Sequence, residues 1–183
     1  HKEYRRQRQM CIRDRDPVAP DVKDNESFEP KYEDKLVVPG KETKSTPTFT
    51  DKDGKDTKAP EGSKFTIPDD FTVPEGYKVD IDENTGVITV TAPEELDAET
   101  VEEFDVPVTV TYPDKTTDDA SAKFELDTDG DGTPDSKDDD DDNDGVSDKE
   151  EKEKGTNPKD PDSKPEDPVA PDVKDNESFE PKY

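Results

Sequence analysis

The stretch Val106–Tyr112 reads VPVTVTY, and it decides the fold of this chain. Its valines and tyrosine alternate with proline and threonine, so one face of an extended strand is apolar and the other face is polar. This period of two is typical of a half-buried β-strand. Pro107 has no N–H group to offer a neighbouring strand, so we expect the start of this strand to lie at a sheet edge or a bulge.

The same alternation recurs on both sides of this stretch. Apolar residues concentrate between Leu36 and Leu126, with alternating runs at 77–82, 88–91 and 120–126 and shorter candidates at 36–38, 48–50 and 64–67. Turn signals occur at 82–86 and at Asp53-Gly54. Residues 94–104 are predicted to form a loop leading into a strand. Seven short strands without a long helix predict an all-β fold, a β-sandwich.

The core of this sandwich is predicted from the apolar face of each strand. Burial of these side chains would offset the chain entropy only narrowly. The predicted core residues are Phe49, Phe65, Ile67, Tyr77, Val79, Ile81, Ile88, Val90, Val108, Val110, Tyr112, Phe124 and Leu126.

Residues 1–15 differ in composition from everything that follows. They contain all five arginines, the only histidine (His1) and the only cysteine (Cys11) of the chain. They have neither the apolar segment nor the cleavage site of a signal peptide. We interpret residues 1–15 as an artefact or a tag, expect them to be disordered, and leave them out of the fold prediction.

The remaining chain is strongly acidic. The whole sequence has a net charge of −27, and residues 1–15 contribute six basic and two acidic residues, so residues 16–183 carry −31. This charge excludes nucleic acid as a main partner, disfavours an anionic membrane surface and attracts cations. No segment has the apolar length of a membrane span.

A catalytic constellation is not found in the sequence. Without His1 no histidine remains for a Ser-His pair or a His-metal site, so the chain is predicted not to be an enzyme. A Lys–Asn crosslink would have to use Asn84, the only asparagine of the β region. Because Asn84 lies in a predicted turn, we expect an ordinary turn there.

A seventeen-residue string occurs twice. Asp16–Tyr32 reads DPVAPDVKDNESFEPKY, and Asp167–Tyr183 repeats it without a substitution, 151 residues later. This identity predicts a tandem array, of which the chain holds one repeat and the start of the next. The predicted divisions are a linker at 16–30, the sandwich at 31–126, an Asp-rich segment at 127–154, and a linker entering the next repeat at 155–183.

The Asp-rich segment is predicted to carry the chemistry. The pattern D-x-D-x-D-G-x-x-D occurs at 127–135 and again at 140–148, and the second copy extends to Glu151 with EF-hand spacing. Alternating carboxylates around a glycine turn suit Ca²⁺. Ser147 is expected to cap one short helix that Gly155 ends. The plainer alternative is a solvated acidic linker. The predicted metal ligands are Asp127, Asp129, Asp131, Thr133, Asp135, Asp138, Asp140, Asp142, Asp144, Val146, Asp148 and Glu151.

Residues 32–127 resemble a long-form Rib domain, the Rib/alpha-like repeat of Gram-positive surface proteins. The resemblance is carried by YEDKLVVPGKETKSTPTFT, GYKVDIDENTGVITVTAP and above all VPVTVTYPD. It implies an immunoglobulin-like β-sandwich, tandem arrays and anchoring to the cell wall. The family usually has glycine after YPD, whereas this chain has Lys115, so we expect a turn that does not require a positive φ there.

Residues 127–158 resemble bacterial thrombospondin type 3 repeats, in which the chain wraps around Ca²⁺ with little hydrophobic core. Together the two resemblances imply a stalk or spacer module of an extracellular, cell-wall-anchored adhesin that Ca²⁺ rigidifies. We expect a monomer whose partners are neighbouring repeats of the same chain, with a host surface ligand or the cell wall as further partners. The alternative is that the sandwich itself binds a host glycan or protein.

Overall fold

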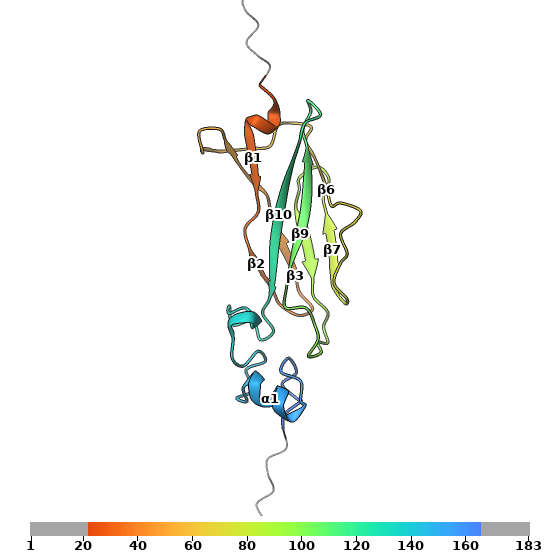
Figure 1. Ribbon diagram of the computed structural model, residues 1–183, viewed down its shortest axis with the longest axis vertical. Coiled ribbons are helices and arrows are strands. Elements are labelled where there is room, and N and C mark those ends of the chain that lie inside the picture. Colours follow the sequence, from red (N-terminus) through yellow and green to blue (C-terminus); the bar gives the residue numbers. More distant parts are fainter. Residues whose placement is uncertain (1–21, 166–183) are drawn as a thin grey trace, which may run out of the picture.

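The computed structural model describes residues 22–165 of the 183 (Figure 1). The described part is elongated, and its strands run mostly along the long axis. Its first residues lie at one end and helix α1 (Asp148–Lys154) lies at the other. Our predictions for residues 1–15 and for the second copy of the repeated string fall outside the described residues.

The strands precede the helix, as the sequence predicts. Ten strands and two short 3-10 turns accompany α1 in the described residues. The strands are β1 (Phe28–Lys31), β2 (Lys35–Val37), β3 (Glu42–Ser45), β4 (Thr48–Asp51), β5 (Asp56–Thr57), β6 (Lys64–Thr66), β7 (Lys78–Ile81), β8 (Ile88–Thr91), β9 (Glu103–Thr111) and β10 (Thr117–Leu126), and the 3-10 turns are η1 (Asp24–Glu26) and η2 (Asp135–Lys137).

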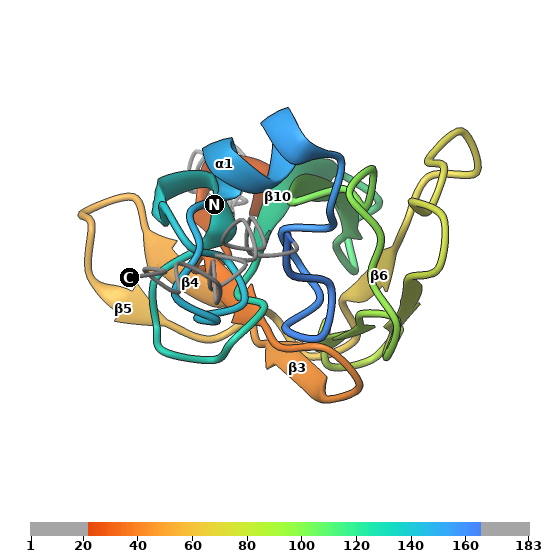
Figure 2. The same ribbon diagram turned by 90° about the horizontal axis from the view of Figure 1, so that it is seen from below.

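The strands form three sheets around one core. A four-stranded sheet has the order β2-β10-β9-β6, and two three-stranded sheets have the orders β3-β8-β7 and β1-β4-β5. The pair β9–β10 is antiparallel along its length, whereas β2 joins β10 in parallel. Figure 2, seen along the long axis, shows the strands surrounding the interior. The predicted all-β fold is therefore confirmed.

The VPVTVTY stretch behaves as its alternation predicts. All of it except Tyr112 lies in β9, where Val106, Val108 and Val110 are buried and the residues between them are half-buried. On one side β9 pairs with β10 over its whole length. On the other side β6 pairs only with 109–111, so the sheet has an edge beside Pro107. The expected edge position of the proline is confirmed, and its missing N–H group costs no ladder bond on that side.

Most of the predicted core is buried, and the buried residues form one cluster. Ile67, Val79 and Ile81 are only partly buried and pack against its margin, so their prediction as core was wrong in degree. Five buried residues were missing from the predicted core: Tyr32, Val37, Ala92, Val106 and Ala122. Tyr32 also donates its hydroxyl hydrogen to the carbonyl of Gly86 at 2.7 Å.

The two predicted hairpin turns are present. Residues 82–86 join β7 to β8, and Asp53-Gly54 lies between β4 and β5. In the first turn Asp82 Oδ1 accepts the N–H groups of Asn84 and Thr85. Asn84 also accepts a hydrogen bond from Lys64 Nζ at 2.5 Å, and both side chains are exposed. This contact is a surface hydrogen bond on an ordinary turn.

The sandwich begins inside the range predicted as a linker. Strand β1 starts at Phe28, whose ring lies 6.2 Å from that of Tyr112, and Asp24 donates its N–H to Asp114 Oδ2 at 2.9 Å. These contacts attach the chain entry to the β9–β10 hairpin. Among residues 22–165 no helix has both the length and the apolar character needed to cross a membrane.

The turn between β9 and β10 contradicts our prediction. Lys115 has a φ of 72°, the left-handed conformation that we expected this turn to avoid. Asp114 is the reason, because its Oδ1 accepts both the N–H and the hydroxyl of Thr116, while its Oδ2 accepts the N–H of Asp24. These bonds lower the pKa of Asp114, with the Asp24 bond as the largest cause. They hold the turn in a shape that suits glycine better than lysine.

Replacing Lys115 with glycine is therefore expected to stabilise the sandwich. Relief of the left-handed strain, less the entropy that glycine adds to the unfolded chain, should raise the free energy of unfolding by about 0.5–1 kcal/mol. Urea denaturation of the Lys115→Gly variant measures this. Lys115→Ala keeps the Cβ atom and serves as the control. An equal gain from alanine would show that loss of the lysine side chain, and not strain, is responsible.

Candidate metal centre

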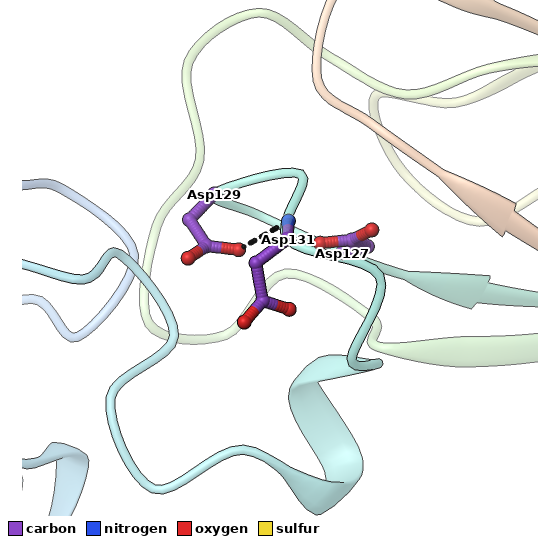
Figure 3. A group of neighbouring side chains, drawn as sticks. All are labelled: Asp127, Asp129 and Asp131. Atoms are coloured by element: carbon purple, nitrogen blue, oxygen red, sulfur yellow. Dashed lines mark hydrogen bonds between the residues drawn. The ribbon is translucent and has the colours of Figure 1, made fainter.

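The first Asp-rich loop follows β10 directly. Asp127, Asp129 and Asp131 each have a carboxylate oxygen within 4.8 Å of the others, and Figure 3 shows the three side chains around one turn of backbone. Gly130 and Gly132 both have positive φ and donate their N–H groups to Asp127, at 2.8 and 3.1 Å. The turn thus folds around its first carboxylate, and the three carboxylates converge as a hard cation requires.

The second loop repeats this geometry thirteen residues later. Carboxylate oxygens of Asp140, Asp142 and Asp144 again lie within 4.8 Å of one another. Gly145 donates its N–H to Asp140 Oδ2 at 3.0 Å, and Asp144 donates its N–H to Oδ1 of both Asp140 and Asp142 at 3.1 Å. Asn143 adopts a positive φ of 56°, a conformation that asparagine tolerates well. Both predicted aspartate triads are therefore assembled by their backbones.

Helix α1 carries the last of the predicted ligands, Glu151. Ser147 caps the helix by accepting the N–H of Glu150 at 3.4 Å, and Gly155 ends it with a φ of 78°. This confirms the predicted short helix. Glu151 lies in its first turn and is 0% exposed. A carboxylate buried this deeply normally has a partner.

The second loop instead contains buried carboxylate oxygens that have no hydrogen-bond partner. Both Oε atoms of Glu151 and the Oδ2 atoms of Asp142 and Asp144 have no hydrogen-bond partner among the described residues. Asp144 Oδ2 has an ion pair, with Lys164 Nζ at 3.5 Å. An unpartnered buried carboxylate costs several kcal/mol unless a counter-ion approaches it. The oxygens of Asp142 and Glu151 therefore fit a divalent cation.

The pKa values report the same crowding of charge. Burial raises the pKa of Asp142 to about 6, with the neighbouring charge of Asp144 as the next cause. Burial also raises the pKa of Glu151, followed by the charge of Asp142. In the first loop, burial raises the pKa of Asp127, although two N–H groups oppose the shift. A bound cation would favour the ionised form of all three groups.

The aspartates at the ninth positions have a different placement. Asp135 accepts the N–H and the hydroxyl of Thr128, at 2.8 and 2.7 Å, so both of its oxygens are used. In the second loop Asp148 Oδ1 accepts the N–H of Asp141 at 2.9 Å. Each carboxylate thus closes its loop by bonding to the residue at the second position. That arrangement shapes the loops directly, whereas a role as metal ligands stays a prediction.

The other predicted ligands surround the two triads. Thr133 and Val146 each donate an N–H to the aspartate two positions earlier, at 2.6 and 2.7 Å. Asp138 Oδ1 accepts the N–H of Asp140 at 3.1 Å and so connects the end of the first loop to the start of the second. The three stay predicted ligands.

Two charged residues of this region were missed from the sequence. Asp141 is 1% exposed, and burial raises its pKa to about 8, followed by the charges of Asp135 and Asp148. Its nearest cation is Lys159, 3.4 Å away, whose side chain is fully buried. One signal was present, because Asp141 occupies the second position of its loop, where the first loop has the neutral Thr128.

Comparison with known families finds two matches, one in the β region and one in the Asp-rich segment. The Long Rib domain model matches residues 25–127, and the Bacterial TSP3 repeat model matches residues 140–161. The second match includes Asp140, Asp142, Asp144 and Glu151. No curated protein matches the chain.

Several solved structures resemble about half of this chain, and weakly. Protocadherin Gamma B2 extracellular cadherin domains 1-5 are 19% identical with a TM-score of 0.35, covering 51% of this chain and 17% of that one. Mouse clustered PcdhgC3 EC1-3 is 15% identical with a TM-score of 0.34, covering 54% and 33%. The sialic acid binding region of the Streptococcus sanguinis SK1 adhesin is 20% identical with a TM-score of 0.27, covering 55% and 30%. The chain thus spans a third or less of each of these structures.

The family match rests on the same residues as the fold. It begins within η1 and ends at Asp127, where β10 passes into the first Asp-rich loop, so it includes all ten strands. It also covers more than half of the 183 residues. The chain belongs to the Long Rib domain family.

Proposed function

We propose that this chain is a stalk or spacer module of a cell-wall-anchored, extracellular adhesin of Gram-positive type, and that Ca²⁺ rigidifies it. The two family matches suggest a repeat module of a bacterial surface protein. The repeated string at 16–32 and 167–183 supports a tandem arrangement. In that arrangement the neighbouring repeats of the same chain are its first partners.

The observation that carries the calcium proposal is the set of buried oxygens without a hydrogen bond in the second loop. Asp142, Asp144 and Glu151 would hold the ion together with Asp140, and Asp127, Asp129 and Asp131 would hold a second ion in the first loop. Ca²⁺ prefers oxygen ligands in an irregular shell, and the donors that converge here are carboxylates. Bound Ca²⁺ would neutralise loops whose carboxylates otherwise repel one another.

Calorimetry and small-angle scattering test this proposal together. Titration of the chain with Ca²⁺ should give binding heat with a Kd of about 10⁻⁴–10⁻³ M, the range of extracellular modules. The radius of gyration and the maximum dimension should change between chelator and millimolar Ca²⁺ as the C-terminal unit, made of the two Asp-rich loops and α1, becomes ordered. Absence of binding heat would reject the calcium role, and binding without any change in dimensions would reject rigidification.

Direct binding of a host glycan or protein by the sandwich is the alternative hypothesis. Binding of this chain to a glycan array or to host cells, in chelator as well as in Ca²⁺, would support it over a purely mechanical role.

A further inference from the structure

The segment after α1 returns to the sandwich. Residues 156–163 fold on themselves, with Asn157 accepting the N–H of Lys159 at 3.2 Å and donating its own N–H to Ser163 Oγ at 3.0 Å. The amide of Asn157 also donates to the carbonyl of Leu96 at 2.9 Å, across 61 residues of sequence. Leu96 belongs to the loop before β9 and packs against the core. The segment predicted as a linker therefore contacts the sandwich directly.

Lys159 is the centre of this contact. Its side chain is fully buried, and Nζ donates to Glu102 Oε1 at 2.8 Å on the sandwich side. On the other side Nζ lies 3.4 Å from Asp141 Oδ2, in the second Asp-rich loop. The Asp141 side chain is also fully buried, and neither of its oxygens has a hydrogen bond. One ammonium group thus joins carboxylates from two units.

The position of Asp141 explains why a lysine is needed there. Asp141 lies between Asp140 and Asp142, whose oxygens converge with that of Asp144 on the candidate metal site. Its backbone N–H is held by Asp148, and its side chain meets Lys159. In the first loop the equivalent residue is Thr128, which bonds to Asp135 and needs no cation. The second loop therefore carries one extra buried charge, and Lys159 is the cation beside it.

We propose that Lys159 is a built-in cation that locks the second Asp-rich loop onto the sandwich and so fixes the direction in which the chain leaves each repeat. Breaking a buried ion pair from one side leaves an uncompensated charge, so loss of Lys159 would weaken the contact between the two units. The biological meaning of this lock rests on the proposed stalk function. The ion pairs of Lys159 with Glu102 and Asp141 themselves contain no metal ion.

The distance between one spin label on the sandwich and one on α1 shows whether Lys159 holds the two units in a fixed arrangement. With Cys11→Ser as background, one label replaces the exposed Lys58 on the sandwich and another replaces the exposed Lys149 on α1. Double electron–electron resonance should give a narrow distance distribution for the otherwise unchanged chain. Lys159→Met should broaden that distribution at least twofold. Lys154→Met is the matched control, because Lys154 pairs with Glu150 on the exposed surface of α1, and the distribution should stay narrow.

A second variant covers the case in which Lys159→Met disturbs folding. Glu102→Gln removes the sandwich partner without changing its shape and should broaden the distribution in the same direction. The double variant should be no broader than Lys159→Met alone, because both changes break one contact. Unchanged distributions in Lys159→Met and Glu102→Gln would overturn the proposal.

Calorimetry on the same samples separates this proposal from the calcium proposal. Narrow distributions that broaden on Lys159→Met, with no heat from Ca²⁺, would support the lock and reject the calcium joint. Normal calcium binding with distributions that do not respond to Lys159→Met would reject the lock and leave the calcium role intact.

Discussion

Gly86→Ala is expected to lower the free energy of unfolding of the sandwich by about 2–5 kcal/mol. A Cβ atom at Gly86 would lie 2.6 Å from the ring of Phe65 and 2.8 Å from Pro47, and the residue has a φ of 72°. Phe65 is 1% exposed and packs edge-on against Phe49, so its ring has little room to move. The variant therefore suffers both overpacking and backbone strain.

Gly54→Ala separates these two costs. Gly54 also has a positive φ, 76°, but a Cβ atom there would meet nothing within 4 Å. The free energy of unfolding of Gly54→Ala should fall by only about 1 kcal/mol, the cost of the left-handed conformation. Urea denaturation of both variants in chelator, followed by circular dichroism, measures the sandwich without any contribution from metal. Equal losses in the two variants would show that the contact with Phe65 is not tight.

Glu151→Gln should change the stability of the C-terminal unit in opposite directions with and without Ca²⁺. In chelator the variant removes a fully buried carboxylate that has no hydrogen-bond partner, so the unit should become more stable. In Ca²⁺ it removes a ligand. Because even a group that only orients a metal ligand is worth about 10–100-fold in affinity, the loss here should be at least that large. Calorimetry gives the affinity, and hydrogen exchange of the α1 amides gives the stability.

Glu153→Gln is the matched control for this sign reversal. It makes the same chemical change on the same helix, but Glu153 is exposed. Its calcium affinity and exchange rates should stay close to those of the unchanged chain. A Glu151→Gln variant that was destabilised in chelator as well would mean that Glu151 serves the fold and not a cation.

The parts of the fold that could be predicted are those in which neighbouring residues carry the signal. Alternation in β9 placed Val108 and Val110 in the core because the side-chain period of a strand is local. Val37 was missed because its burial depends on the pairing of β2 with β10, which brings distant segments together. Lys115 was misjudged for a similar reason, since the bond from Asp24 to Asp114 spans 90 residues.

The candidate site also has a part that the sequence predicts and a part that it does not. The spacing of Asp140, Asp142 and Asp144 fixes how their carboxylates converge, so the sequence was sufficient to group them. The environment of Asp141 depends on Lys159, and Lys159 in turn contacts Glu102, 57 residues earlier. Periodicity and spacing carry no information on such a long-range contact. The contact forms only because the chain turns back to the sandwich after α1.

The placement of β10 has a mechanical consequence. The described chain begins at one end of the long axis, and β10 delivers it to the Asp-rich unit at the other, while β10 itself lies between β2 and β9. Tension applied between the two ends would pull β10 along its own length. The ladder bonds on both sides lie across that direction, so they would resist in shear and would have to fail together instead of opening one by one.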